Sequence, residues 1–107
     1  KLVALGLATA KRSPLAPQIA TLPEQGLAIE SNSWNGILTR SGTPDAVVQR
    51  LNAEINKALQ APAVVQAFAD GGIVSLAGTP DRFANFIRSE TDKYAQVIHK
   101  AGITSDV

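Results

Sequence analysis

The sequence predicts an α/β fold, and three observations lead to that prediction. Residues 2–9 are almost continuously apolar, which is typical of a strand covered on both faces of a parallel sheet. The tetrapeptide Gly-Thr-Pro-Asp occurs twice, at positions 42–45 and 78–81, each time between a strand-like run and a helix-like run. Apolar residues recur with a helical period after both turns. Strands that alternate with helices indicate an α/β domain.

The first forty residues are expected to contain two strands and one short helix. Residues 2–9 form the first strand, and a connector with two prolines follows it. Thr21-Leu22-Pro23-Glu24 has the pattern of a capping box and predicts about one turn of helix, which Gly26 ends. Residues 28–40 then form a long, half-polar strand that bends at Gly36. A broken strand of this kind is typical of a hinge between two domains.

The next segment predicts two helices. The first helix covers residues 44–60, with Thr43 as its cap and Pro44 at the first helical position. Its spacing places five apolar residues on one face: Val47, Leu51, Ile55, Ala58 and Leu59. The second helix covers residues 62–69 and stops at Gly71-Gly72.

A short strand and a long helix complete the chain. Residues 73–76 form the strand, and Thr79 caps the helix that follows. The helical spacing predicts a buried stripe composed of Phe83, Ile87, Tyr94, Val97, Ile98 and Ala101. Gly102 ends this helix.

Composition excludes several classes of protein. The formal charge of the 107 residues is +1 and the basic residues are scattered, so there is no electrostatic case for nucleic acid. Cysteine is absent, and His99 is the one histidine, which excludes thiolate and two-histidine metal sites within one chain. No nucleophile has a base at a recognisable spacing. We therefore expect no enzyme activity, no catalytic residue, no metal and no cofactor.

The N-terminus allows two interpretations. Lys1, a short apolar run and Ala8-Thr9-Ala10 together imitate a signal peptide with its small-residue cleavage site. The apolar stretch is at the lower length limit for such a segment, so a buried strand is the favoured interpretation.

One stretch has the composition of a ligand-contact site. Ser33, Trp34 and Asn35 place a hydroxyl, an aromatic ring and an amide next to the expected bend. Such groups are suited to holding a small polar ligand or its bridging waters. The alternative is a strand whose Trp34 packs in the core while its neighbours are solvated.

The order of the motifs resembles one receptor family. Several strings along nearly the whole chain are similar to the Bug-type substrate-binding receptors of tripartite tricarboxylate transporters: positions 1–14, 20–26, 33–36, 42–44, 51–59, 78–80, 86–87 and 101–103. One departure is Asn35, because an aromatic residue is common there in such receptors. This departure puts the contribution of position 35 to a ligand cleft in doubt.

The resemblance implies a place within a larger fold. It implies the C-terminal third of a two-lobed periplasmic binding protein of the type II-like class, built of strand-helix units with a long C-terminal helix. Residues 1–27 would end the second lobe, residues 28–41 would form the strand that crosses the hinge, and residues 42–107 would belong to the first lobe. The main ligand-binding loops of such receptors lie earlier, so we expect this segment to bind ligand poorly on its own.

The resemblance also implies a function and partners. Such a receptor is periplasmic, binds a small organic carboxylate or amino acid by lobe closure without chemistry, and delivers it to membrane permease subunits. Its signal peptide would not be in this chain. The alternative is a self-contained interaction or regulatory module. Because the strands at 2–9 and 28–40 would lack sheet neighbours, we expect a homodimer or a strand-exchanged assembly of the chain alone.

Overall fold

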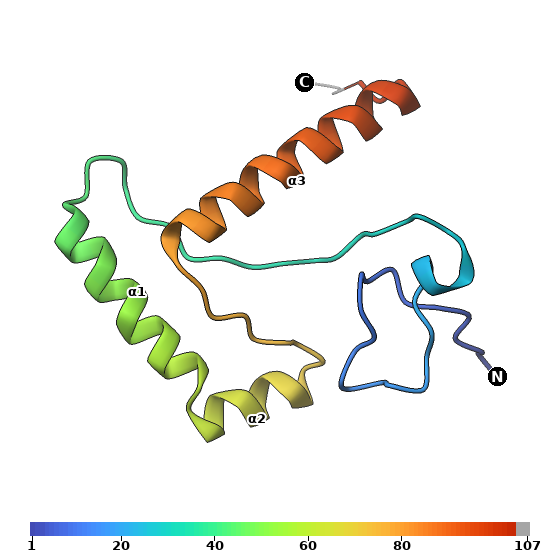
Figure 1. Ribbon diagram of the computed structural model, residues 1–107, viewed down its shortest axis with the longest axis horizontal. Helices are drawn as coiled ribbons and strands as arrows, with labels where there is room; N and C mark the ends of the chain where they lie inside the picture. Colours follow the sequence, from blue (N-terminus) through green and yellow to red (C-terminus); the bar gives the residue numbers. More distant parts are fainter. Residues whose placement is uncertain (105–107) are drawn as a thin grey trace. The chain divides into compact units, whose positions relative to one another are not determined.

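The computed structural model describes residues 1–104, and the chain divides into two compact units, Lys1–Leu38 and Thr39–Val107. The first unit contains a single turn of 3-10 helix, η1, at Pro23–Gln25. The second contains three helices: α1 at Asp45–Leu59, α2 at Pro62–Asp70 and α3 at Pro80–Ala101 (Figure 1).

The prediction of an α/β fold is wrong for this structure. Residues 1–104 contain helices and irregular connections, with no strand and no sheet. The segments expected as strands, 2–9, 28–40 and 73–76, have no strand assignment. An isolated parallel bridge between Leu7 and Thr21 is the only ladder-type pairing within the described residues.

The physical reason is that a strand requires a partner. An apolar run favours burial in a sheet, but its backbone groups must pair with another extended segment over several residues. In the first unit, Leu7 N–H donates to the Ala20 oxygen at 3.0 Å and the Leu7 oxygen accepts from Leu22 N–H at 2.8 Å. Ser31 N–H donates to the Ala8 oxygen at 2.9 Å. These are single contacts, too few for a ladder.

The three predicted helices are confirmed, because the sequence signals of a helix lie within the helix itself or next to its ends. The three helices begin and end within two residues of the expected positions. Thr79 caps α3 as predicted, since its hydroxyl accepts from Arg82 N–H at 3.2 Å. Gly102 ends α3 with φ of 63°, and Gly26 ends η1 with φ of 84°, the left-handed conformation that glycine adopts without steric cost.

The predicted cap of α1 is wrong. Pro44 is the residue that precedes the helix, and no side chain caps it. The Thr43 hydroxyl instead donates to the Arg40 oxygen at 2.7 Å. The two Gly-Thr-Pro-Asp turns therefore differ in their hydrogen bonds despite their identical sequence.

In the second unit, the helices pack against one another through α1. α1 contacts both α2 and α3. The larger half-buried apolar residues on these helices are Val48, Ile55, Leu59, Val64, Phe68, Phe83 and Ile87. Asn52 and Asn56 lie among them and are also half-buried.

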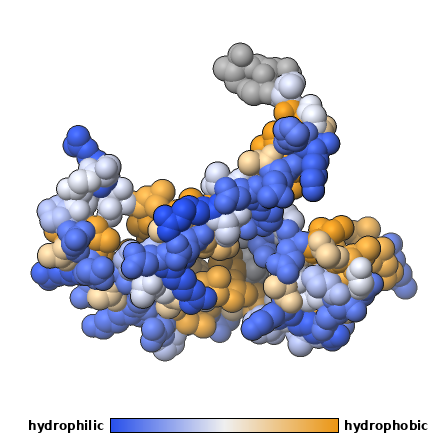
Figure 2. Space-filling model, turned by 45° about the horizontal axis from the view of Figure 1, so that its top comes forward, coloured by the Kyte–Doolittle hydropathy of each residue, from blue (hydrophilic) through white to orange (hydrophobic). Residues whose placement is uncertain are grey.

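Much of each predicted apolar stripe is open to solvent. On α1, Val47 is 47% exposed and Leu51 is 44% exposed, while Ile55 and Leu59 are half-buried. On α3, Phe83 and Ile87 are half-buried, whereas Tyr94, Val97 and Ile98 are exposed. Figure 2 shows that hydrophobic side chains, in orange, are exposed on the face in view. Among residues 1–104 no large apolar side chain is fully buried.

Candidate functional site

The predicted ligand-contact residues lie in the connection that follows η1. Ser33, Trp34 and Asn35 fall within the first unit, outside any helix, and all three are exposed. Trp34 exposes 42% of its surface. The connection is anchored just before this stretch, at the Ser31 N–H bond to Ala8.

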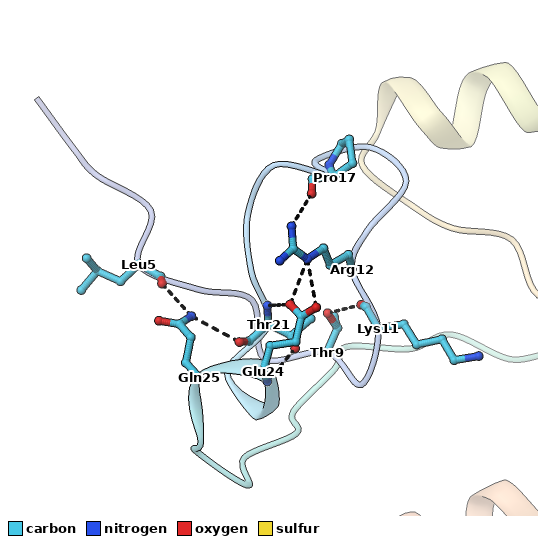
Figure 3. Close-up of polar contacts among 8 residues, drawn as sticks. All are labelled: Leu5, Thr9, Lys11, Arg12, Pro17, Thr21, Glu24 and Gln25. Carbon is cyan, nitrogen blue, oxygen red and sulfur yellow. Dashed lines mark hydrogen bonds and ion pairs between the residues drawn. The ribbon is translucent and has the colours of Figure 1, made fainter.

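A network of polar side chains holds the neighbouring loops together (Figure 3). The Arg12 guanidinium Nε lies 3.1 Å from Glu24 Oε1 and 2.9 Å from Oε2, and another of its nitrogens donates to the Pro17 oxygen at 3.1 Å. Glu24 Oε2 also accepts from Thr21 N–H at 2.8 Å, and Glu24 N–H donates to the Thr21 hydroxyl at 3.2 Å. This reciprocal pair has the geometry of the predicted capping box.

Gln25 extends the network to the N-terminal segment. Its Nε2 donates to the Leu5 oxygen at 2.9 Å and to the Thr21 oxygen at 3.2 Å. Gly6 lies close by: a Cβ added to it would fall 2.6 Å from Gln25 Nε2 and 2.8 Å from Leu22 Cδ2. The absence of a side chain at position 6 therefore allows the close approach of these two segments.

The charges of this network are already matched. The Thr21 backbone N–H, followed by the Arg12 guanidinium, holds the pKa of Glu24 below its usual value. Because Arg12 is paired with a carboxylate, its charge is balanced before any anion arrives. We therefore assign the network a structural role, in which it holds the loops around η1 together.

The second unit contains a separate cluster that the sequence analysis missed. Nδ2 of Asn52 and Nδ2 of Asn56 each donate to the Gly78 oxygen at 2.9 Å, and Gly78 N–H donates to Asn56 Oδ1 at 3.1 Å. We call these three residues the amide clamp. A signal was available, because asparagine is a weak helix former and these two lie four positions apart on one face.

A shallow hollow of about 370 Å³ lies on the outer side of α1. It is lined by Ala46, Val47, Arg50, Leu51 and Glu54, all from the same helix. None of the predicted site residues contributes to it.

In the part of the chain that the structure describes, no group of three or more His, Cys, Asp or Glu side chains is arranged to hold a metal ion. Within the same residues, no helix is both long enough and apolar enough to cross a bilayer.

Comparison with known proteins identifies the family. The family model for the tripartite tricarboxylate transporter family receptor matches residues 1–103. The chain belongs to this receptor family. The Bug-type resemblance and the assignment to transport are thereby confirmed.

Two relatives are longer than the segment that this chain matches. A UPF0065 protein from the tcbD-tcbE intergenic region of Pseudomonas sp. is 42% identical over 97 residues, which cover 89% of this chain and 29% of the relative. Protein BugT of Bordetella pertussis is 34% identical over 100 residues, which cover 92% of this chain and 31% of BugT. The chain therefore spans about 30% of the length of these curated relatives.

Proposed function

We propose that the chain is the C-terminal part of a periplasmic receptor that binds a small organic carboxylate or amino acid without chemistry and delivers it to membrane permease subunits. The observation that supports this proposal is the match of residues 1–103 to the tripartite tricarboxylate transporter receptor family. In this proposal, ligand is held by closure of two lobes. Residues 1–27 contribute to one lobe, residues 42–107 contribute to the other, and residues 28–41 cross between them.

Two observations support the proposed crossing segment and the proposed ligand contacts at residues 33–35. The boundary between the compact units, at Leu38 and Thr39, falls inside the proposed crossing segment. Ser33, Trp34 and Asn35 lie in the same segment with their side chains exposed. A hydroxyl, an indole ring and an amide can hold a carboxylate by hydrogen bonds and by contact with its hydrocarbon part.

A chimeric receptor tests the proposal. Residues 1–103 replace the matching segment of the Pseudomonas relative, and thermal unfolding is followed with succinate, citrate or glutamate. Stabilisation by one of these ligands supports a solute receptor, because a ligand that binds only the folded state raises the unfolding temperature. Loss of that stabilisation in Ser33→Ala and Trp34→Ala supports the site. A chimera that folds and is stabilised by none of a broad panel of carboxylates and amino acids contradicts the proposal.

We also propose that two copies of the isolated 107-residue chain associate. Several large apolar side chains of the first unit are mostly exposed. The exposed fraction is between 79% and 103% for Leu2, Val3 and Leu5, and it is 69% for Ile37 and 73% for Leu38. Burial of one such side chain contributes roughly 1.5–3 kcal/mol, which favours association when no other part of a receptor covers it.

A further inference from the structure

We infer that the Asn35–Gly36 bond is a site of spontaneous deamidation, a covalent modification that converts position 35 from a neutral amide to a carboxylate. Both residues are exposed and lie outside the helices. In the described part of the chain, neither the Asn35 side-chain amide nor the Gly36 N–H takes part in a hydrogen bond. The two groups that must react are therefore accessible and unrestrained.

The chemistry needs only water. The backbone nitrogen of Gly36 loses its proton and attacks Cγ of Asn35, a new C–N bond forms, and the side-chain nitrogen leaves as ammonia. Water then opens the resulting five-membered succinimide at either carbonyl. Opening at one carbonyl gives aspartate in a normal backbone, and opening at the other gives isoaspartate, in which the chain runs through the side-chain carbon. Glycine assists the first step because it has no Cβ to obstruct the attack and imposes few conformational limits.

The other asparagines of the chain are protected in different ways. Asn52 and Asn56 lie in α1 and are held by the amide clamp. Asn85 lies in α3, where its Oδ1 accepts from Arg88. In both helices the next backbone N–H belongs to the helical ladder and cannot attack. Asn32 shares the connection with Asn35, but Ser33 follows it and presents a Cβ.

The modification changes the charge at the proposed ligand site. The formal net charge of the chain falls from +1 to neutral when one carboxylate is added. This consequence rests on the proposed function: a carboxylate next to Trp34 repels an organic anion, and it can no longer donate the hydrogen bonds of an amide. Deamidation would thus switch off anion binding as the protein ages.

The test is carried out on the 107-residue chain. The protein is incubated at neutral and at mildly alkaline pH, sampled over time, digested and analysed by mass spectrometry with fragmentation that separates aspartate from isoaspartate. We expect Asn35 to convert at least about tenfold faster than Asn32, and to convert faster at higher pH, because only Asn35 precedes a residue without Cβ. Equal rates at the five asparagines, or no conversion at position 35, would overturn the inference.

Matched variants identify the attacking group. Gly36→Ala keeps Asn35 and adds only a methyl group, and Gly36 is not among the glycines with a positive φ, so its backbone conformation is one that alanine can adopt. We expect this variant to convert at the Asn32 rate and Asn32→Gln to leave conversion at position 35 unchanged. If Gly36→Ala converts as fast as the parent, the assigned mechanism is wrong.

The effect on binding is measured separately in the chimeric receptor. Asn35→Asp reproduces the aspartate product and Asn35→Gln keeps a neutral amide. We expect weaker binding of succinate or citrate in Asn35→Asp than in Asn35→Gln. Equal binding by the two variants would reject the charge switch, and binding by both at the affinity of the parent would also reject a role of position 35. Neither result bears on the deamidation rates, which are measured independently.

Discussion

The side-chain amide of Asn56 hydrogen-bonds both backbone groups of Gly78. Nδ2 donates to the Gly78 oxygen at 2.9 Å, and Oδ1 accepts from the Gly78 N–H at 3.1 Å. A carboxamide presents the same donor and acceptor pair as a peptide group, so Asn56 takes the place that a neighbouring strand would occupy. Asn52 adds a second donor to the same oxygen. The clamp thereby fixes the residue before the α3 cap against the middle of α1.

The clamp predicts a large effect of one substitution. Asn56→Ala leaves the half-buried N–H of Gly78 without this acceptor and removes one of two donors from its oxygen. We expect the free energy of unfolding to fall by about 1–3 kcal/mol, because a polar group left unsatisfied loses its desolvation compensation. Urea unfolding followed by far-UV circular dichroism measures the change.

Asn85→Ala is the control for the clamp. Asn85 is an exposed helical asparagine whose amide contacts Arg88 on the same helix. Its replacement is expected to change stability by less than about 0.5 kcal/mol, the usual range for surface positions. Similar losses in the two variants would mean that the clamp contributes nothing specific.

The two Gly-Thr-Pro-Asp turns predict unequal effects of the same substitution. Thr79→Ala removes the hydroxyl that accepts from Arg82 N–H, and we expect a loss of about 1 kcal/mol, the typical value for an N-cap. Thr43→Ala removes a hydroxyl that donates to the Arg40 oxygen outside the helix, so a smaller loss is expected. Unfolding of both variants under identical conditions provides the comparison, and equal losses would contradict it.

The Glu24 network predicts acid sensitivity of the first unit. The folded-state pKa of Glu24 lies below its ordinary value of 4.5, so the ionised form is favoured by folding. Its contribution is present above pH 4.5 and is lost as the pH falls through the lowered folded-state value. Glu24→Gln should be less stable than the parent near neutral pH, and the difference should shrink on acidification.

The measurement is urea unfolding of both proteins at a series of pH values. Glu30→Gln, at an exposed glutamate of the same unit, serves as the control. A difference between parent and Glu24→Gln that stays constant from neutral to acid pH would show that ionisation of Glu24 does not contribute to folding.

The exposed apolar residues predict association of the isolated chain. We expect light scattering after size-exclusion chromatography to show a dimer, and Leu38→Lys to shift it toward monomer by placing a charge on an apolar contact. Gln49→Lys, at an exposed polar position of α1, adds the same charge and should leave the mass unchanged. A parent chain that is monomeric at every concentration would contradict the prediction.

Helices could be predicted here because their signals lie within a few residues of one another. The Thr79 cap, Gly102 and the apolar period of α3 are all contained in the segment that they describe. The strands could not be predicted in the same way. The apolar run at 2–9 reports a preference for burial, whereas a sheet depends on partner segments that no local pattern reveals.

The candidate site and its surroundings also combine features that a local pattern reveals with contacts that it does not. The crowding of Ser33, Trp34 and Asn35 is visible in the sequence, and their contact with ligand remains a prediction. The clamp was missed because its partner, Gly78, lies 22 positions from Asn56. The Arg12–Glu24 pair spans 12 positions and was missed for the same reason.

By itself the sequence determined the receptor family, the three helices and the left-handed glycines that end η1 and α3, because each of these is encoded in local order. Only the tertiary structure decided which side of α1 packs. The apolar period predicted a buried face that included Val47, Leu51, Ile55 and Leu59. Of these four, Ile55 and Leu59 are half-buried, together with Asn52 and Asn56, whereas Val47 and Leu51 are exposed. Two amides are retained there because Gly78 satisfies their hydrogen bonds, and a satisfied polar group can be buried at little cost.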